Sequence, residues 1–215
     1  MSGIPPATDG QDREEARALA SAFRFVRDLF RPPGAEQWEF LRSKETWGAW
    51  TDLAARLGLS GPAPLPRSAR EYETQYIETF EVGAPHPHVP LIESHYLRRD
   101  PVPRILHENI LFYAAFGLRL SAGSEETSDH LRHQLDFLGY LCEREAAETD
   151  SERLEQIRRA RSEYLERHVA SWVGLAAGKA ADCPYPCLRD LLSLLVAVVD
   201  AAGGRLPAPA EEPER

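Results

Sequence analysis

Histidine side chains are concentrated in one proline-bearing segment of this chain. His86, His88 and His95 lie within GAPHPHVPLIESHY, and the pair Asp129-His130 follows later in the sequence. Imidazole nitrogens are common zinc ligands, and a zinc-bound water can act as a hydrolytic nucleophile. A metal-dependent hydrolase that uses His86, His88, His95 and His130 is therefore one interpretation of this chain.

The spacing of these residues favours binding over catalysis. His86 and His88 flank a proline, so they cannot project from one face of a helix. The chain has no His-Glu-x-x-His run and no Gly-rich phosphate loop, and Ser94 lacks the Gly-x-Ser-x-Gly surroundings of a nucleophile. We therefore expect the polar rings to line a peptide groove, with no catalytic residue, no metal and no cofactor.

The histidine-bearing segment is predicted to form one wall of this groove. Three prolines in it fix φ and favour an extended residue before each of them: Pro85, Pro87 and Pro90. Ahead of the segment, Tyr72, Tyr76 and Phe80 recur every four residues, which predicts an amphipathic helix over residues 70–81. We expect part of this stripe to pack in the core and its Phe80 end to line the groove.

Acidic side chains flank the predicted groove. Glu81 ends the aromatic helix, Glu93 follows the prolines, and Asp129 precedes a leucine stripe at residues 131, 135 and 138. Carboxylates at the rim of an apolar groove attract and orient a basic ligand. Because Asp129 and His130 lie outside the leucine stripe, we expect them to serve the ligand and expect their replacement to leave the packing intact.

Several short motifs occur in a characteristic order. They are residues 76–80 (YIETF), Glu81-Val82-Gly83, residues 89–96 (VPLIESHY), Asp129-His130 with residues 135–138 (LDFL), and His168 four residues before Trp172. On these motifs the chain resembles the TorD/DmsD/NarJ family of redox-enzyme maturation chaperones, over residues 15–203. The resemblance points to the branch that serves enzymes of the type II dimethyl sulfoxide reductase family.

The resemblance implies a function without catalysis. It implies a cytoplasmic chaperone that binds the apo catalytic subunit of a molybdenum oxidoreductase, and its twin-arginine leader, assists cofactor insertion and delays export. The client-binding or leader-binding residues that it implies are Tyr76, Phe80, Glu81, Gly83, Pro90, Leu91, Glu93, Ser94, Tyr96, Asp129 and His130. A general helical adaptor protein is the other alternative, beside the hydrolase.

The composition limits the possible partners. At 215 residues the chain suits one domain, and its net charge of -9 disfavours nucleic acid and suits a cationic partner. Three cysteines are an odd number, which does not suit a disulfide framework. No charged region precedes an apolar one near Met1, and no apolar run reaches the roughly 18 residues of a membrane span. We expect a cytoplasmic monomer.

Helical periodicity covers most of the chain, and no alternating β pattern of useful length occurs. Ser128 and Ser151 are predicted N-caps, and the apolar residues 110–118 are predicted to form a central helix. The polar, proline-bearing residues 1–12 and 204–215 are predicted to be disordered. The sequence therefore predicts an all-α fold, a compact single-domain TorD-like bundle over residues 13–203 with a long proline-containing loop.

Overall fold

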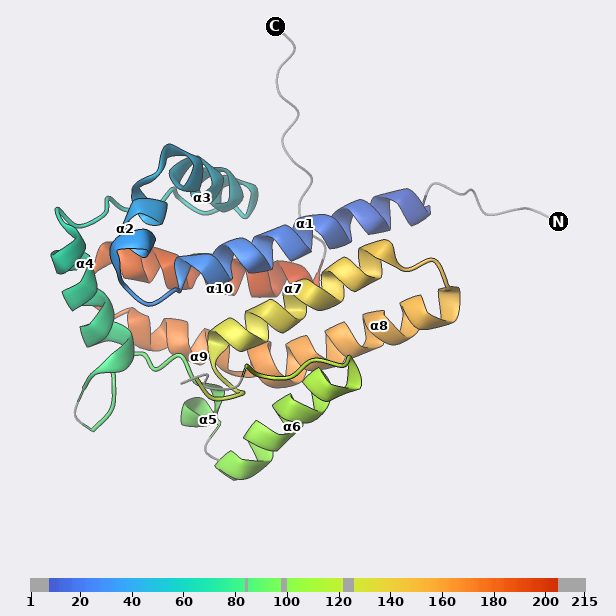
Figure 1. Cartoon of the computed structure of the whole chain (residues 1–215). Helices are drawn as coiled ribbons and strands as arrows, with labels where there is room; N and C mark the ends of the chain where they lie inside the picture. The colour runs from blue at the N-terminus through green and yellow to red at the C-terminus, as the bar shows by residue number, and fades with distance from the viewer. Residues whose placement is uncertain (1–7, 84, 98–99, 122–125, 205–215) are drawn as a thin grey trace, which may run out of the picture.

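The computed structural model of the chain describes residues 8–83, 85–97, 100–121 and 126–204. They form ten α-helices and two π-helical segments (Figure 1): α1 Thr8–Leu29, α2 Ala35–Arg42, α3 Lys44–Arg56, α4 Ala69–Tyr76, η1 Ile77–Glu81, α5 Glu93–Tyr96, α6 Val102–Ala115, α7 Leu131–Ala147, α8 Ser151–Tyr164, η2 Leu165–Ala170, α9 Ser171–Ala180 and α10 Pro186–Gly203. The described residues contain no strand, only an isolated antiparallel bridge between Ile92 and His130. The prediction of an all-α fold is confirmed.

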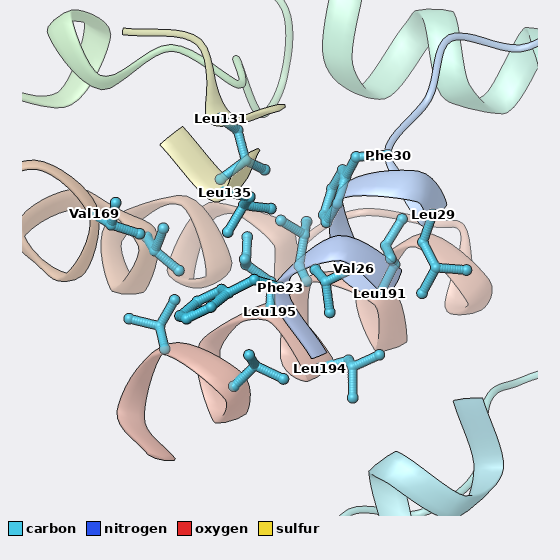
Figure 2. Packing of buried hydrophobic residues seen from close by; sticks show 14 of the residues in the cluster. Phe23, Val26, Leu29, Phe30, Leu131, Leu135, Val169, Leu191, Leu194 and Leu195 are labelled. Carbon is cyan, nitrogen blue, oxygen red and sulfur yellow. The ribbon is translucent and has the colours of Figure 1, made fainter. Parts of the chain in front are cut away.

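The core lies where α1 packs between α7 and α10. The stripe that begins at Leu19 on α1 is buried, and it includes Phe23, Val26 and Phe30. Figure 2 shows these side chains meeting leucines of α7 and α10, among them Leu135. Burial of this apolar area is the main favourable term in folding, so α1, α7 and α10 form the rigid frame of the molecule.

A long helical run and short helices complete the bundle. α8, η2 and α9 follow one another without a break, and Trp172 on α9 is buried. α2 ends at Arg42, and α3 ends at Arg56, two residues before Gly58, whose φ of 71° is a conformation that glycine adopts without strain. None of the described helices is long and apolar enough to cross a membrane.

The structure corrects several local predictions. α1 begins at Thr8, inside the segment predicted to be disordered; residues 1–7 and 205–215 lie outside the described part of the chain. α6 is not a central helix, because only one of its faces is buried and Ile110 remains 46% exposed. The Ser128 hydroxyl donates to the Leu106 carbonyl and caps no helix, since α7 begins one residue after His130. Asp150, rather than Ser151, caps α8.

The leucines at the centre of the frame should dominate its stability. Leu135 is fully buried between α7 and its neighbours, whereas Leu175 on α9 is 54% exposed. We expect Leu135→Ala to lower the free energy of unfolding by about 2–5 kcal/mol, because it leaves a cavity in the core. The same change at Leu175 should alter it by about 0.5 kcal/mol or less. Urea denaturation followed by circular dichroism measures both; equal losses would contradict the assignment of the core.

Candidate functional site

The proline-bearing loop begins with a tight reversal after η1. The Val89 N–H donates to the Thr79 carbonyl at 2.7 Å, so the chain returns to the end of the helix that it has just left. A Cβ atom added at Gly83 would overlap the carbonyl group of His86. Only glycine therefore allows this close backbone approach. Gly83 shapes the loop and does not contribute a side chain to a site.

The second half of the loop pairs with the residues that precede α7. The Leu131 N–H donates to the Leu91 carbonyl at 2.9 Å, and the Glu93 N–H donates to the Asp129 carbonyl at 3.1 Å. These bonds surround the bridge between Ile92 and His130. They satisfy backbone groups that an extended segment could not satisfy by itself. Two segments that lie far apart in the sequence thus form one wall.

A groove of about 770 Å³ opens between this wall and the end of the aromatic helix. The groove is lined by the turn after α1, by α4, η1, the proline-bearing loop, α5 and α6, and by the residues before α7. The lining residues are Pro32, Tyr76, Phe80, Glu81, His86, Pro87, Pro90, Leu91, Ile92, Ser94, His95, Val102, Glu126 and His130. Of the eleven residues predicted for the site, the groove brings seven together: Tyr76, Phe80, Glu81, Pro90, Leu91, Ser94 and His130. Gly83, Glu93, Tyr96 and Asp129 do not line it.

The aromatic residues give the groove its shape. The Tyr76 hydroxyl donates to the Phe30 carbonyl at 2.9 Å, and the Tyr76 and Phe80 rings meet edge to face with centroids 4.9 Å apart. Both side chains are buried, as is Leu91, which is only 3% exposed. Packing against the core holds these walls in place. Val102, at the start of α6, is 48% exposed and adds apolar surface to the groove.

Asp129 has a structural role, so its predicted place at an acidic rim is wrong. Its side chain is 0% exposed. One carboxylate oxygen accepts the Ser94 N–H at 3.0 Å, and the other accepts the Thr127 hydroxyl at 2.5 Å. A carboxylate that accepts a free N–H in the first turn of a helix stabilises that helix. Asp129 therefore caps α5 from a distant part of the chain.

The predicted rim position of Glu93 is also wrong. Its side chain is 1% exposed and points away from the groove into the bundle. Its carboxylate accepts hydrogen bonds from Gln134 at 2.6 Å, Asn109 at 3.0 Å and the Nδ1 of His168 at 3.0 Å. A buried carboxylate needs such partners because burial without them is costly. Sequence alone gives no signal that pairs these four residues.

The acidic groups that do line the groove are Glu81 and Glu126. Glu81 is exposed at the end of η1, and partial desolvation raises the pKa of its carboxyl group. Glu126 accepts from the Arg132 guanidinium at 2.6 Å and lies 3.6 Å from the Nδ1 of His130. Glu126 was missed as a site residue in the sequence prediction, although it stands three residues before the Asp-His pair.

His130 combines a structural bond with a place in the groove. Its Nδ1 accepts the Arg132 N–H at 3.3 Å and caps α7, which leaves the ring proton on Nε2. Burial lowers the pKa of His130 to about 4, although the nearby Glu126 carboxylate acts in the opposite direction. The ring is therefore neutral near pH 7, and it lines the groove as an uncharged polar group.

The loop histidines do not form a metal centre with the arrangement that a hydrolase requires. The rings of His86 and His95 meet edge to face with centroids 4.4 Å apart. The Nε2 of His95 accepts from the Lys179 ammonium at 3.0 Å, so a cation already occupies the lone pair that a metal would need. Within the described part of the chain, no group of three or more candidate ligands could hold a metal ion.

Comparisons with known proteins agree with the sequence resemblance. Residues 42–177 match the family model described as nitrate reductase delta subunit. The chain is 35% identical over 188 residues to the selenate reductase assembly chaperone protein of Thauera selenatis, which covers 83% of this chain and 88% of that protein. It is 30% identical over 161 residues to the chlorate reductase assembly chaperone protein of Ideonella dechloratans, with 74% and 75% of the two chains covered. It is also 30% identical over 137 residues to the perchlorate reductase assembly chaperone protein of Dechloromonas aromatica, with 61% of each chain covered.

Removal of the Asp129 carboxylate should destabilise the fold. Asp129→Ala leaves the Ser94 N–H and the Thr127 hydroxyl without their acceptor, and unsatisfied buried polar groups cost about 1–3 kcal/mol each. We expect a clear fall in melting temperature, and a smaller one for Asp129→Asn, which keeps an acceptor oxygen. The exposed Asp52 on α3 is the control, and Asp52→Ala should leave the melting temperature unchanged within error. An unaltered Asp129→Ala protein would restore the ligand-binding interpretation.

The neutral state of His130 predicts a pH dependence of stability. The unfolded chain binds a proton at His130 below about pH 6.5, whereas the folded chain binds one only near pH 4, so the free energy of unfolding falls as the pH drops between these values. His130→Asn keeps an N-cap acceptor and removes this proton. Urea unfolding of both proteins at several pH values should show that the stability of the variant falls less between about pH 6.5 and 4. Parallel curves would contradict the prediction.

Proposed function

Because this chain belongs to the nitrate reductase delta subunit family, we propose that it is a dedicated assembly chaperone for a molybdenum oxidoreductase of the type II dimethyl sulfoxide reductase family. Its client is the apo catalytic subunit, which it binds in the cytoplasm before export. The names of the three relatives support this proposal, since each is an assembly chaperone of a reductase. The sequence resemblance supports the class of client.

The groove is the observation that carries the proposal. It combines apolar walls at Phe80, Leu91 and Val102 with the acidic groups of Glu81 and Glu126. A twin-arginine leader has the complementary chemistry, namely a basic head and an apolar body. Burial of the apolar body stabilises the complex by roughly 25 cal/mol per Å². The two carboxylates attract the basic head and orient it, which affects the association rate more than the affinity.

The groove is suited to binding an extended segment without chemistry. Its aromatic walls are already packed against the core, so little side-chain entropy is lost when a ligand binds. His130 and His95 are held by bonds to the Arg132 N–H and to Lys179, which fixes their roles as hydrogen-bonding groups. We therefore propose that the protein is not an enzyme and that it acts as a monomer by sheltering the client until its cofactor is inserted.

Co-purification tests the proposal directly. The tagged full-length chain is expressed in its native host during growth on the reductase substrate, and bound polypeptides are identified by mass spectrometry. We expect the catalytic subunit, without its cofactor and with its leader intact. Recovery of unrelated proteins in equal amounts would favour a general adaptor. A stoichiometric metal in the purified chaperone, measured by elemental analysis, would favour the hydrolase.

A charge in the groove should weaken binding of the leader. Val102→Lys places a cation on the groove wall, where a basic leader is repelled and an unpaired charge is desolvated. We expect about tenfold weaker affinity or more in calorimetry with a synthetic peptide of the client's leader, since such burial costs on the order of 1–3 kcal/mol. Ile110→Lys is the matched control, because it lies on the same helix, has a similar exposure of 46% and lines no part of this groove. Equal effects of the two variants would place the leader elsewhere.

A further inference from the structure

α5 is a single helical turn that forms part of the groove wall. Its two central residues, Ser94 and His95, line the groove, whereas the residues at its two ends face the bundle. At one end Glu93 is buried, and at the other the Tyr96 ring stacks on Trp172 with centroids 5.3 Å apart. A four-residue helix is not stable by itself. Its position in the groove wall therefore depends on these two inward side chains and on the Asp129 cap.

Glu93 provides the polar half of this attachment. Its carboxylate accepts from three donors that lie on three other elements: Asn109 on α6, Gln134 on α7 and His168 on η2. These partners are separated from it by 16, 41 and 75 residues in the sequence. One side chain thus joins the groove wall to three other elements of the bundle, of which α7 belongs to the frame.

The partners of Glu93 are themselves held in a fixed orientation. The indole N–H of Trp172 donates to the Gln134 oxygen at 3.1 Å, and the Tyr164 hydroxyl donates to the Asn109 oxygen at 2.6 Å. Each amide therefore turns its NH2 group towards Glu93 and its oxygen away. Every group around the carboxylate is a donor, and only an acceptor without protons satisfies all of them.

We propose that Glu93 is a positioning residue for client binding, which holds α5 against the frame so that Ser94 and His95 stand in the wall of a preformed groove. This inference rests on the proposed function for the identity of the ligand, but the attachment of α5 can be measured without it. Glu93 itself touches no ligand, because its carboxylate lies on the inner side of α5.

The chemistry of the site predicts what Glu93→Gln would do. Glutamine has nearly the same shape and keeps one oxygen, which can accept from Asn109 and Gln134 as the Oε2 of Glu93 does, but its NH2 group would face the Nδ1–H of His168. The bond to His168 and the negative charge that strengthens the other two bonds would be lost, and α5 would detach for part of the time. The apparent affinity for a ligand falls in proportion to the fraction of molecules that are competent to bind. If α5 is attached in a tenth of the molecules, binding is about tenfold weaker.

The experiment compares Glu93→Gln with a variant that loses stability elsewhere. Val198 is fully buried on α10, so Val198→Ala destabilises the frame without touching α5. Hydrogen exchange is measured on the peptide that covers residues 91–97, and affinity is measured with the leader peptide of the co-purified catalytic subunit. Gln134→Met, which removes one donor to Glu93, serves as a milder second variant if Glu93→Gln does not fold.

We expect Glu93→Gln to speed exchange in residues 91–97 and to weaken peptide binding about tenfold. Val198→Ala should lower the stability of the whole protein, but it should not speed exchange in residues 91–97 beyond that general loss, and it should leave the affinity for the peptide unchanged. Unchanged exchange and affinity in a folded Glu93→Gln protein, or equal changes in Val198→Ala, would overturn the inference. If exchange increases in Glu93→Gln and the wild-type chain binds no leader peptide, α5 is attached as inferred and the leader-binding part of the proposed function fails.

Discussion

An extended segment can lie against a helical bundle only if its polar groups find partners there. Helices satisfy their own backbone groups, but the loop between η1 and α5 cannot. Its last residues are satisfied by the stretch before α7, through the backbone bonds of Leu91 and Glu93 and through the Asp129 cap on α5. The groove exists because these two segments are joined, since together they form the wall that faces Tyr76 and Phe80.

This constraint explains how the acidic residues are divided. Glu93 and Asp129 are buried and fully used in holding the loop, whereas Glu81 and Glu126 remain at the groove. A buried carboxylate with several donors holds its neighbours in one arrangement. Glu126 is itself paired with Arg132, and Glu81 is exposed at the end of η1. Carboxylates therefore hold the wall in one place and lie at the surface of the groove in another.

Of the two π-helical segments, η1 lines the groove and η2 contacts the buried Glu93 behind its wall. η1 carries Phe80 and Glu81 to the start of the loop, and η2 carries His168 to the carboxylate of Glu93. π-helical turns are rare and often occur at functional sites.

Local patterns were sufficient to predict the framework. The stripe on α1, the aromatic helix that ends at Phe80 and the buried Trp172 follow from apolar spacing, because a helix repeats every 3.6 residues whatever it packs against. Proline also acts locally, so the proline-bearing loop was visible in the sequence, whereas Gly83 was predicted as a binding residue and its close approach to His86 was not. Seven of the eleven predicted site residues line one groove.

Only the tertiary structure decided which way each polar side chain faces. Glu93 and Asp129 have the same local surroundings in sequence as a solvent-exposed rim residue, yet their partners come from 16 to 75 residues away. Glu126 belongs to the groove because the chain before α7 returns to the loop, which no local pattern reveals. Burial of a charge depends on long-range partners, whereas helical periodicity depends on neighbours in the chain. The sequence by itself therefore determined the helices and the region of the groove, and the fold determined which of its charges are buried in the structure and which lie at the groove.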